Sequence, residues 1–526
     1  MNNWKIRIIG VFILLTMAWY LPWLFNNLNL DAFWLSIPFA IASIMTALMI
    51  LITVINHWTS RVPDLHPLPE GETHDVAIII PTYGEPTDMV YRTARSVLEQ
   101  NYVQECIHLI ISDDGHRFAI REIVAQLQQA YPAADIFYFE PPLRGDPQRH
   151  GEAKAGNLNA AFDFIKGWDQ PPDFIETRDA DDLIGNPDFL RQAIGQLEHD
   201  PALAFVQTIK EAHVDEGDPF GNLEPLFYRK AMLARNAANA VFPCGSGLVW
   251  RREALEDIGG FPVWNLVEDL QSGVEALRRD WRGTYLPIVG AIGQTAPEDI
   301  PNVIKQRGTW ALDTMRLTFW GDKSGLNLRQ HLQFAELGFF YMLSFAVLVF
   351  AITPVFSLIF DVYPLITTQT KYALHFWPHA LAVELLLIAL ADGLPYEDLW
   401  RARQTWLGLA PVYLKAMFIA ILYGPNRKPT YRVTRKEHVH RLYLREILPQ
   451  LVLVLTLIGG SIYHILTKSL LITADLGSLF WAAFFVVGLS RTVRNAWYGV
   501  ALREHFFGRA RRMAFLRGFL SIFGSD

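Results

Sequence analysis

Three segments rich in acidic and polar residues each follow a short apolar run in the middle of the chain. They are PTYGEP (81–86), SDDG (112–115) and RDADD (178–182). If the apolar runs are parallel strands, these segments meet at one edge of a sheet, because such sheets bind ligands beyond the carboxyl ends of their strands. We therefore expect a site for a cation or a polar ligand at that edge.

The spacing of Asp179 and Asp181 suits a metal ion. Residues i and i+2 of an extended segment point the same way, so both carboxylates can face one ion. Oxygen ligands favour Mg²⁺ or Mn²⁺, which also take substrate phosphates, and such an ion neutralises a diphosphate leaving group. Lys154 could supply a second positive charge. The alternative is a solvated turn with a solvated lysine nearby, since Asp is an ordinary turn residue.

The elements that would position these residues alternate along the chain. Apolar runs predict strands, and amphipathic stretches between them predict helices. Such alternation is typical of βαβ units and a mostly parallel α/β sheet. The predicted strands are 76–80, 107–111, 136–139, 174–176 and 204–207, and the predicted helices are 91–99, 118–130 and 153–165.

The composition of the whole chain indicates an integral membrane protein. Of 526 residues, 51% are hydrophobic and 19% are charged, against about 25% charged in ordinary soluble domains. A net charge of -7 gives no support to nucleic-acid binding, so no nucleic-acid partner is expected. The two cysteines, Cys106 and Cys244, exclude a disulfide-built scaffold.

Long apolar stretches at both ends of the chain predict about six membrane spans. A segment of this length can cross about 30 Å of hydrocarbon. A further apolar stretch, 405–423, contains Lys415 near its middle; a lysine is costly at a bilayer centre but tolerated in an interfacial helix, which is the reading we favour. The predicted spans are 8–25, 32–56, 337–360, 372–390, 447–466 and 476–492.

The distribution of Lys and Arg predicts the orientation. The connection 424–446 carries seven of them and the tail from 503 carries five, whereas 26–31 and 361–370 carry none. By the positive-inside rule, the middle domain, the basic connection and both termini lie in the cytoplasm. Six spans satisfy this pattern, and the predicted location is the cell inner membrane or plasma membrane.

Together these segments resemble the processive family-2 glycosyltransferases, and most of all the catalytic subunits of bacterial cellulose synthases. The resemblance extends over residues 75–436 and implies a cytoplasmic GT-A-type domain between transmembrane helices. The segments occur in the family's order: PTYGEP, SDDG, KAGNLN (154–159), DAD (179–181), FVQT (205–208), PCGSG (243–247), VED (267–269), QRGTW (306–310) and YRVTRK (431–436).

The resemblance divides the chain into five parts. They are an N-terminal transmembrane hairpin (1–62), the glycosyltransferase domain (63–330), a transmembrane pair (331–399), an interfacial helix with a gating loop (400–446), and a second transmembrane pair with a basic tail (447–526).

The resemblance also implies a role for individual residues. Asp269 would be the general base, and Asp179 and Asp181 would hold Mg²⁺ or Mn²⁺. Lys154 would contact the diphosphate and Trp310 would stack on the acceptor sugar. The other implied substrate-binding residues are Thr82, Tyr83, Glu85, Asp113 and Asp114 at the uridine; Cys244, Gly245 and Ser246 near the acceptor; Glu268, Gln306 and Arg307 within the motifs; and Thr434 and Lys436 of the gating loop.

Two of these roles have alternatives in the sequence itself. A carboxylate in reach of the acceptor hydroxyl suffices as a base for an inverting displacement. However, Glu268 and Asp269 also suit the first turn of the helix that follows, where acidic residues are stabilised by the helix dipole. Trp310 could likewise be one of many membrane-interface tryptophans.

The chain departs from the family pattern at Thr309, where an arginine that faces the diphosphate is expected. Arg307 is close in sequence, but residues i and i+2 do not share a helix face. The sequence therefore supplies no arginine at the position that would face the diphosphate. A C-terminal PilZ domain, common in cellulose synthases controlled by cyclic-di-GMP, is also not expected here.

The function implied by the resemblance is transfer of glucose from UDP-glucose to a growing β-glucan that is extruded across the membrane. The implied partners are a UDP-sugar, the polysaccharide acceptor, membrane lipid and a periplasmic subunit. Alternatives are a synthase of curdlan, mixed-linkage glucan or mannan, a non-processive glycolipid glycosyltransferase, and a non-catalytic export subunit.

Overall fold

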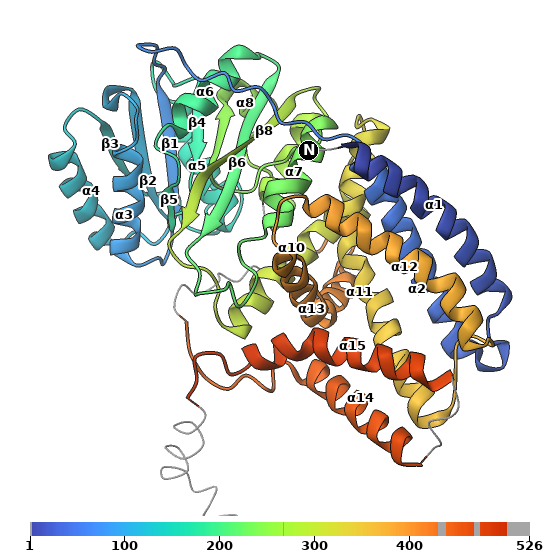
Figure 1. Cartoon of the computed structure of the whole chain (residues 1–526). Helices are drawn as coiled ribbons and strands as arrows, with labels where there is room; N and C mark the ends of the chain where they lie inside the picture. The colour runs from blue at the N-terminus through green and yellow to red at the C-terminus, as the bar shows by residue number, and fades with distance from the viewer. Residues whose placement is uncertain (1–2, 267, 430–437, 468–473, 502–526) are drawn as a thin grey trace, which may run out of the picture.

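The computed structural model describes residues 3–266, 268–429, 438–467 and 474–501. A sheet domain with helices on both faces lies beside a group of long helices (Figure 1). Several short elements complete the two parts: η1 (Leu30–Ala32), η2 (Gln104–Cys106), the π-helical turn η3 (Phe227–Ala231) and α7 (Met232–Ala237).

The sheet has eight strands, and its first four run parallel. These are β1 (Val76–Thr82), β2 (Ile107–Asp113), β3 (Asp135–Phe139) and β4 (Phe174–Thr177). The second half is mixed, and the full order is β3-β2-β1-β4-β7-β6-β8-β5. The remaining strands are β5 (Asp182–Ile184), β6 (Leu203–Ala212), β7 (Leu248–Arg251) and β8 (Arg282–Gly293).

The register of β1 brings the predicted site segments together. Thr82 pairs with Asp113 at the ends of β1 and β2, and Ile79 pairs with Thr177 near the end of β4. The backbone N–H of Arg178 then donates to the Ile79 carbonyl at 3.0 Å. The acidic segments therefore meet at one edge of the sheet, as the sequence predicts.

Both faces of the sheet are covered by helices, so β1 is buried along its whole length. One core contains Phe162 of α5 and Trp250 of β7, and the other contains Val97 of α3 and Leu127 of α4. A strand buried on both faces is largely apolar along its length, so the apolar runs of these strands can be recognised in the sequence. The helices of this domain are α3 (Thr87–Leu98), α4 (Phe118–Ala130), α5 (Ala153–Lys166), α6 (Phe189–His199), α8 (Arg252–Asp257) and α9 (Glu268–Leu277).

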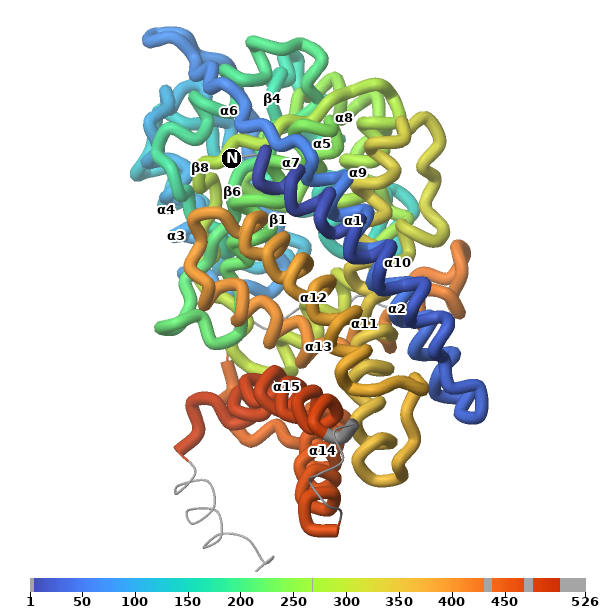
Figure 2. The backbone as a smooth tube through the Cα atoms, turned by 45° about the vertical axis from the view of Figure 1, so that its right-hand side comes forward, coloured from blue at the N-terminus to red at the C-terminus, as the bar shows by residue number. Residues whose placement is uncertain are grey.

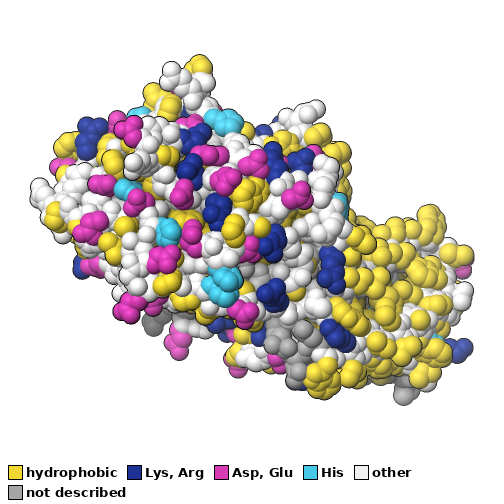
Figure 3. Space-filling view, turned by 90° about the horizontal axis from the view of Figure 1, so that it is seen from above, with side chains coloured by type: hydrophobic (Ala, Val, Ile, Leu, Met, Phe, Trp, Pro, Cys, Tyr) yellow, Lys and Arg dark blue, Asp and Glu magenta, His cyan; other side chains and the backbone are white. Residues whose placement is uncertain are grey.

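Seven helices in the described part of the chain are long and apolar enough to cross a membrane. In Figure 2, α1 lies beside α12 and α2 lies beside α11. Hydrophobic side chains gather on the surface of this part, while charged side chains gather over the sheet domain (Figure 3). The helices are α1 (Asn3–Asn26), α2 (Phe33–Asn56), α11 (Leu328–Phe360), α12 (Gln369–Ala391), α13 (Tyr396–Tyr423), α14 (Leu448–Thr467) and α15 (Ala474–Asn495).

The seventh helix is α13, which covers the segment that the sequence assigns to the membrane interface. It packs on α10 (Ile300–Trp320): Met315 of α10 and Tyr413 of α13 share one buried cluster. Trp320 Nε1 also donates to the Ala420 carbonyl at 2.9 Å. The helix α13 also packs against α11 and α15, two of the other long apolar helices, so its interfacial location stays a prediction.

Cysteine labelling checks this topology. In a variant without Cys106 and Cys244, we expect Asp31→Cys to react with a membrane-impermeant maleimide in intact spheroplasts and Asn426→Cys to react only after lysis. Both positions are exposed, so accessibility of the side chain does not limit either reaction. Labelling of Asn426→Cys in intact spheroplasts would place α13 across the bilayer.

Candidate functional site

A single cavity of about 1930 Å³ connects the acidic edge of the sheet with the long helices. Small-molecule sites usually occupy about 300–1,000 Å³, so this cavity is larger than one nucleotide sugar needs. Its wall includes Thr82, Asp114 and Asp179 from the sheet domain, and Trp406 and Phe376 from α13 and α12.

The turn after β1 is organised by Glu85. Its Oε2 accepts hydrogen bonds from Thr82 Oγ1 at 2.7 Å and from the Tyr83 backbone N–H at 2.8 Å. The Tyr83 ring is 47% exposed and faces the cavity. Thr82, Tyr83 and Glu85 thus form one compact unit, as expected if they bind a common ligand.

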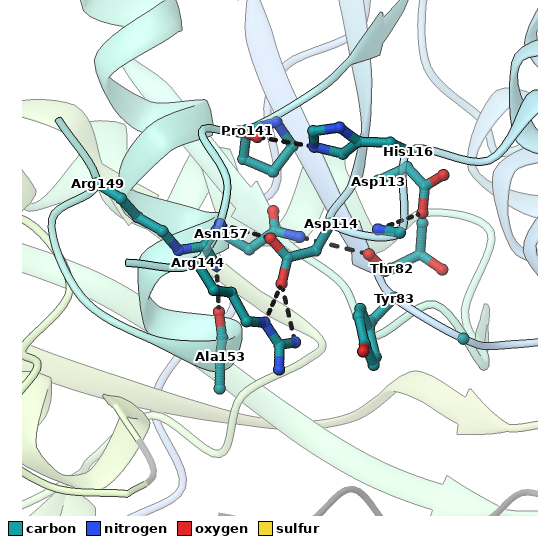
Figure 4. Close-up of polar contacts among 12 residues, drawn as sticks. Thr82, Tyr83, Asp113, Asp114, His116, Pro141, Arg144, Arg149, Ala153 and Asn157 are labelled. Carbon is teal, nitrogen blue, oxygen red and sulfur yellow. Dashed lines mark hydrogen bonds and ion pairs between the residues drawn. The ribbon is translucent and has the colours of Figure 1, made fainter. Parts of the chain in front are cut away.

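Arginines that the sequence does not mark contact the two carboxylates at the end of β2, Asp113 and Asp114. Asp113 accepts from Arg117 Nη2 at 3.0 Å and from the Arg117 backbone N–H at 2.6 Å. Asp114 lies between Arg144 Nη2 at 2.9 Å and Arg149 Nη1 at 2.5 Å (Figure 4). These ion pairs fix the direction of both carboxylates.

Arg144 also covers the Tyr83 ring, with its guanidinium carbon 4.2 Å from the ring centroid. Its side chain is 42% exposed, whereas that of Arg149 is 1% exposed. Arg149 is therefore a buried support, while Arg144 lies at the open face beside Tyr83. No local sequence signal marks Arg144, because it lies in a loop rather than in a regular element.

Two lysines form ion pairs with Asp179, the first carboxylate of the DAD segment. Lys154 Nζ lies 2.6 Å from Asp179 Oδ1, and Lys210 Nζ lies 2.6 Å from Asp179 Oδ2. Burial opposes ionisation of Asp179, but the two ammonium groups outweigh it and lower its pKa well below the usual range. Burial also opposes the charge of Lys154, but the Asp179 and Glu268 carboxylates outweigh it and raise its pKa.

The donor set at this point fits a hard divalent cation only together with a substrate. Among the described residues no group of three His, Cys, Asp or Glu side chains could hold an ion. Asp179 and the buried Asp181 supply two carboxylates at one edge of the cavity. Mg²⁺ is commonly bound by one or two carboxylates plus substrate phosphates and water, so these residues fit that mode.

Asp182 adds a third carboxylate, which the sequence analysis did not assign. It is 1% exposed, and neither of its oxygens has a well-aligned hydrogen bond among the described groups, although Lys210 Nζ lies 2.8 Å from Oδ2. Burial raises the pKa of Asp182. Lys210 thus bridges two carboxylates at the cavity wall.

Asp269 lies in the first turn of α9, where its Oδ1 accepts from the Leu270 backbone N–H at 2.6 Å. This contact agrees with the alternative role as a first-turn charge, but the carboxylate also faces the cavity. Burial and the neighbouring Glu268 carboxylate raise the pKa of Asp269 to about 7. A base with this pKa is well matched to neutral pH.

Gly245 allows Asp269 and Lys154 to come together. Its φ is +84°, and an added Cβ would lie 3.2 Å from both Asp269 Oδ2 and Lys154 Nζ. Only glycine accommodates this backbone conformation and this close approach without strain. At Gly245 the PCGSG segment therefore places backbone atoms, not a side chain, beside Asp269 and Lys154.

The neighbours of Gly245 have different surroundings. Cys244 lines the cavity, and its backbone N–H donates to Gln207 Oε1 at 2.7 Å. Ser246 is fully buried, and its Oγ accepts from the Asp179 backbone N–H at 3.2 Å. Ser246 thus supports Asp179, whereas the resemblance implies a place near the acceptor. Glu268 is 3% exposed and lies 3.2 Å from Lys154 Nζ.

The QRGTW segment lies on α10 and presents Gln306 and Trp310 to the cavity. Arg307 pairs with Glu224, donates to the Gly221 carbonyl at 3.0 Å and covers the Trp310 ring at 4.8 Å. Thr309 Oγ1 donates to the Lys305 carbonyl of its own helix at 2.8 Å. Arg307 is thus engaged by protein groups and packs against the tryptophan that would contact the acceptor.

Two of the predicted motifs fall partly or wholly outside the described residues. The gating-loop segment YRVTRK (431–436), with Thr434 and Lys436, lies outside them, as does Val267 of the VED segment. Their implied roles stay predictions.

The comparisons with known proteins agree with the family resemblance. Residues 74–312 match the model of the glycosyltransferase like family 2. The chain is 32% identical over 292 residues to the UDP-forming cellulose synthase catalytic subunit of Xanthomonas axonopodis pv. citri, covering 52% of this chain and 37% of that one. It is 29% identical over 438 residues to the UDP-forming cellulose synthase 1 catalytic subunit of Komagataeibacter xylinus, covering 79% of this chain and 55% of that one.

The matched part of the chain spans 37% and 55% of the length of these two relatives. Among solved structures, the mannosyltransferase PcManGT from Pyrobaculum calidifontis, in complex with GDP-Man and Mn²⁺, has a TM-score of 0.51 and 20% identity. The structural match covers 73% of this chain and 99% of the mannosyltransferase chain, and it shows that the two share a GT-A-type fold. Residues 74–312 of this chain thus match the glycosyltransferase like family 2 in sequence and the GT-A type in fold.

Proposed function

We propose that the chain is a membrane-embedded, processive, inverting glycosyltransferase that transfers glucose from UDP-glucose to a β-glucan and passes the polymer across the membrane. One observation carries the proposal: the site residues and the long helices line one continuous cavity. An enzyme that releases a short soluble product needs no such continuation. The catalytic domain would lie on the cytoplasmic side of a bacterial inner membrane.

The chemistry follows from the groups around Gly245. Asp269 would take the proton of the acceptor hydroxyl while the acceptor oxygen bonds to C1 of the sugar and the bond from C1 to the diphosphate breaks. UDP leaves with the bonding electron pair. Lys154 lies beside Asp269 and Asp179, where its ammonium would stabilise the negative charge of the departing diphosphate.

A divalent cation completes the proposed donor site. Asp179 and Asp181 would hold Mg²⁺ or Mn²⁺, which neutralises charge on the leaving diphosphate when bound. The Mn²⁺ in the structurally similar mannosyltransferase supports this proposal. Thr82, Tyr83, Glu85 and Asp114 line the cavity and would hold the uridine. The predicted ligand Asp113 is fully buried and would support them through Arg117, which contacts both Asp113 and Thr82.

Aromatic side chains continue from the site into the helices. Trp310 at the cavity wall is followed by Tyr341 of α11, Tyr413 and Trp406 of α13, and Trp481 of α15. Aromatic rings combine a large apolar face with polar edges, which suits the faces of sugar rings. This lining favours a glycan as the occupant of the helical part of the cavity. A periplasmic subunit that receives the polymer belongs to the same proposal.

A second acceptor class has one observation in its favour. The helical part of the cavity is also lined by apolar residues of α2, including Phe39, Met49 and Ile50. A membrane-embedded apolar wall would equally suit the chain of a lipid acceptor. The alternative is therefore a non-processive transferase that glycosylates a lipid.

The test is a donor and product analysis on the purified protein in lipid nanodiscs. It is incubated with radiolabelled UDP-glucose, UDP-galactose or GDP-mannose, with Mg²⁺ or Mn²⁺, and with Asp269→Asn as the inactive control. We expect a solvent-insoluble product from UDP-glucose that linkage-specific β-glucanases digest. Label that partitions with lipids into organic solvent would support the glycolipid alternative, and incorporation from GDP-mannose alone would contradict the proposed donor.

A further inference from the structure

Two lysine ammonium groups from different elements flank Asp179. They differ in the number of protein oxygens that accept their hydrogen bonds. Lys154 comes from the start of α5, and Lys210 comes from β6. Both side chains are about equally accessible, at 28% and 27%, and both line the cavity. The sequence motifs include Lys154 but stop two residues before Lys210.

The protein acceptors around Lys154 match its hydrogen-bonding capacity. A lysine ammonium has three N–H donors and no acceptor. Lys154 Nζ lies 2.6 Å from Asp179 Oδ1, 3.2 Å from Glu268 Oε1 and 3.2 Å from the Gly245 carbonyl. Among the described residues, these three oxygens account for its three donors.

Lys210 has fewer described acceptors. Its Nζ contacts Asp179 Oδ2 at 2.6 Å and Asp182 Oδ2 at 2.8 Å. With three donors and two described protein partners, one N–H can serve a ligand in the cavity. Lys210 lines the same cavity as Asp179 and Asp181, so this donor is available to a ligand that these carboxylates bind.

The QRGTW segment of α10 contains one cationic side chain, Arg307. It pairs with Glu224 and donates to the Gly221 carbonyl, although its buried Nε has no described hydrogen-bond partner. Among the described residues, two of the carboxylates at this strand end, Asp179 and Asp182, pair with Lys154 and Lys210. A diphosphate at this edge therefore needs positive charge from the sheet side.

We propose that Lys210 is a donor-binding residue that contacts the diphosphate of the nucleotide sugar and replaces the missing cation of α10. The inference rests on the proposed function, because it takes a nucleoside diphosphate sugar as the ligand. It assigns to β6 a binding role that lies outside the recognised motifs.

The experiment compares UDP with uridine, so that only the diphosphate differs. Affinities are measured by calorimetry on the full chain in nanodiscs, with EDTA and separately with Mg²⁺. The test variant is Asp182→Asn with Lys210→Met, measured against Asp182→Asn alone. The double variant removes one negative and one positive charge, which avoids leaving a buried carboxylate without its partner. Thermal unfolding checks that both variants fold.

Lys230 provides a matched control within the same cavity. Its Nζ donates to the Asp392 carbonyl at 2.5 Å, away from the three carboxylates. We expect Lys230→Met to leave the affinity for UDP unchanged. In the Asp182→Asn background, Lys210→Arg, which keeps the charge, should retain most of the affinity that Lys210→Met loses.

Loss of Lys210 should weaken UDP about tenfold or more, the scale of a hydrogen bond to a charged group, and leave uridine unchanged. An equal loss for UDP and uridine, or no loss for UDP, would show that Lys210 only supports the fold around Asp182. If the unaltered protein binds neither UDP nor GDP, the proposed function fails first and the inference falls with it. That result differs from the outcome in which the unaltered protein binds UDP and the loss of Lys210 leaves this affinity unchanged.

Discussion

Asp269→Asn is expected to reduce turnover by about 100-fold or more, the scale for losing a positioned general base, while UDP binding stays nearly intact. Asparagine keeps the shape of the side chain but cannot accept the acceptor proton. Sugar incorporation and UDP calorimetry on the same preparation measure the two effects. Turnover at the level of the unaltered protein would remove Asp269 from the mechanism and leave it as a first-turn charge of α9.

The pH dependence gives an independent check on the same residue. Because the pKa of Asp269 is raised to about 7, its basic form grows as the pH rises through that value. The value of kcat/KM should therefore fall as the pH drops below about 7, since this parameter reports the ionisation of the free enzyme. The residual activity of Asp269→Asn should lack this acidic limb. A matching limb in the variant would assign it to another group.

Arg178→Met is expected to destabilise the sheet domain by about 3–5 kcal/mol, the usual cost of removing one partner of a buried ion pair. Arg178 and Glu176 are both fully buried, and Arg178 Nε donates to Glu176 Oε1 at 2.6 Å. The variant leaves the Glu176 carboxylate in the core without its partner. The loss is measured as a decrease in the free energy of unfolding, or as a lower Tm in detergent.

The control is the pair Glu176→Met with Arg178→Met. Replacing both partners by apolar groups of similar size is often nearly neutral, so the double variant should recover most of the lost stability. Arg178 also donates to the Leu183 and Gly290 carbonyls, at 3.1 and 3.2 Å, which anchors the acidic segment to β8. A single variant as stable as the double variant would contradict the buried-pair account.

The sequence by itself determined the elements whose patterns are local. Runs such as 76–80, and 107–111 apart from His108, are apolar because helices cover both faces of the sheet there, and all the predicted strands and sheet-domain helices are present. The long apolar segments were equally clear, because a membrane helix must be apolar over its full length. The acidic strand ends followed from these elements, since parallel strands end at one edge.

Weak local patterns hid three of the four strands in the second half of the sheet, β5, β7 and β8. β7 has four residues and β5 has three, which are too few to show a period. β8 is long, but it contains Pro287 and several glycines, residues that are depleted in strands. Pairing with β6 stabilises it despite this composition, and its register shifts along that strand. Such pairing between distant segments leaves no signal in either segment alone.

Only the tertiary structure decided which charges meet. Asp179, Lys154 and Lys210 lie on three elements, and Arg144 reaches Asp114 from a loop. The sequence marks where a carboxylate follows a strand, but the partner of that carboxylate depends on the packing of distant elements. Motif order found Lys154, whereas Lys210 became visible through its distances to two carboxylates. The physical reason is that hydrogen bonds and ion pairs act over a few ångströms in space, whatever the separation along the chain.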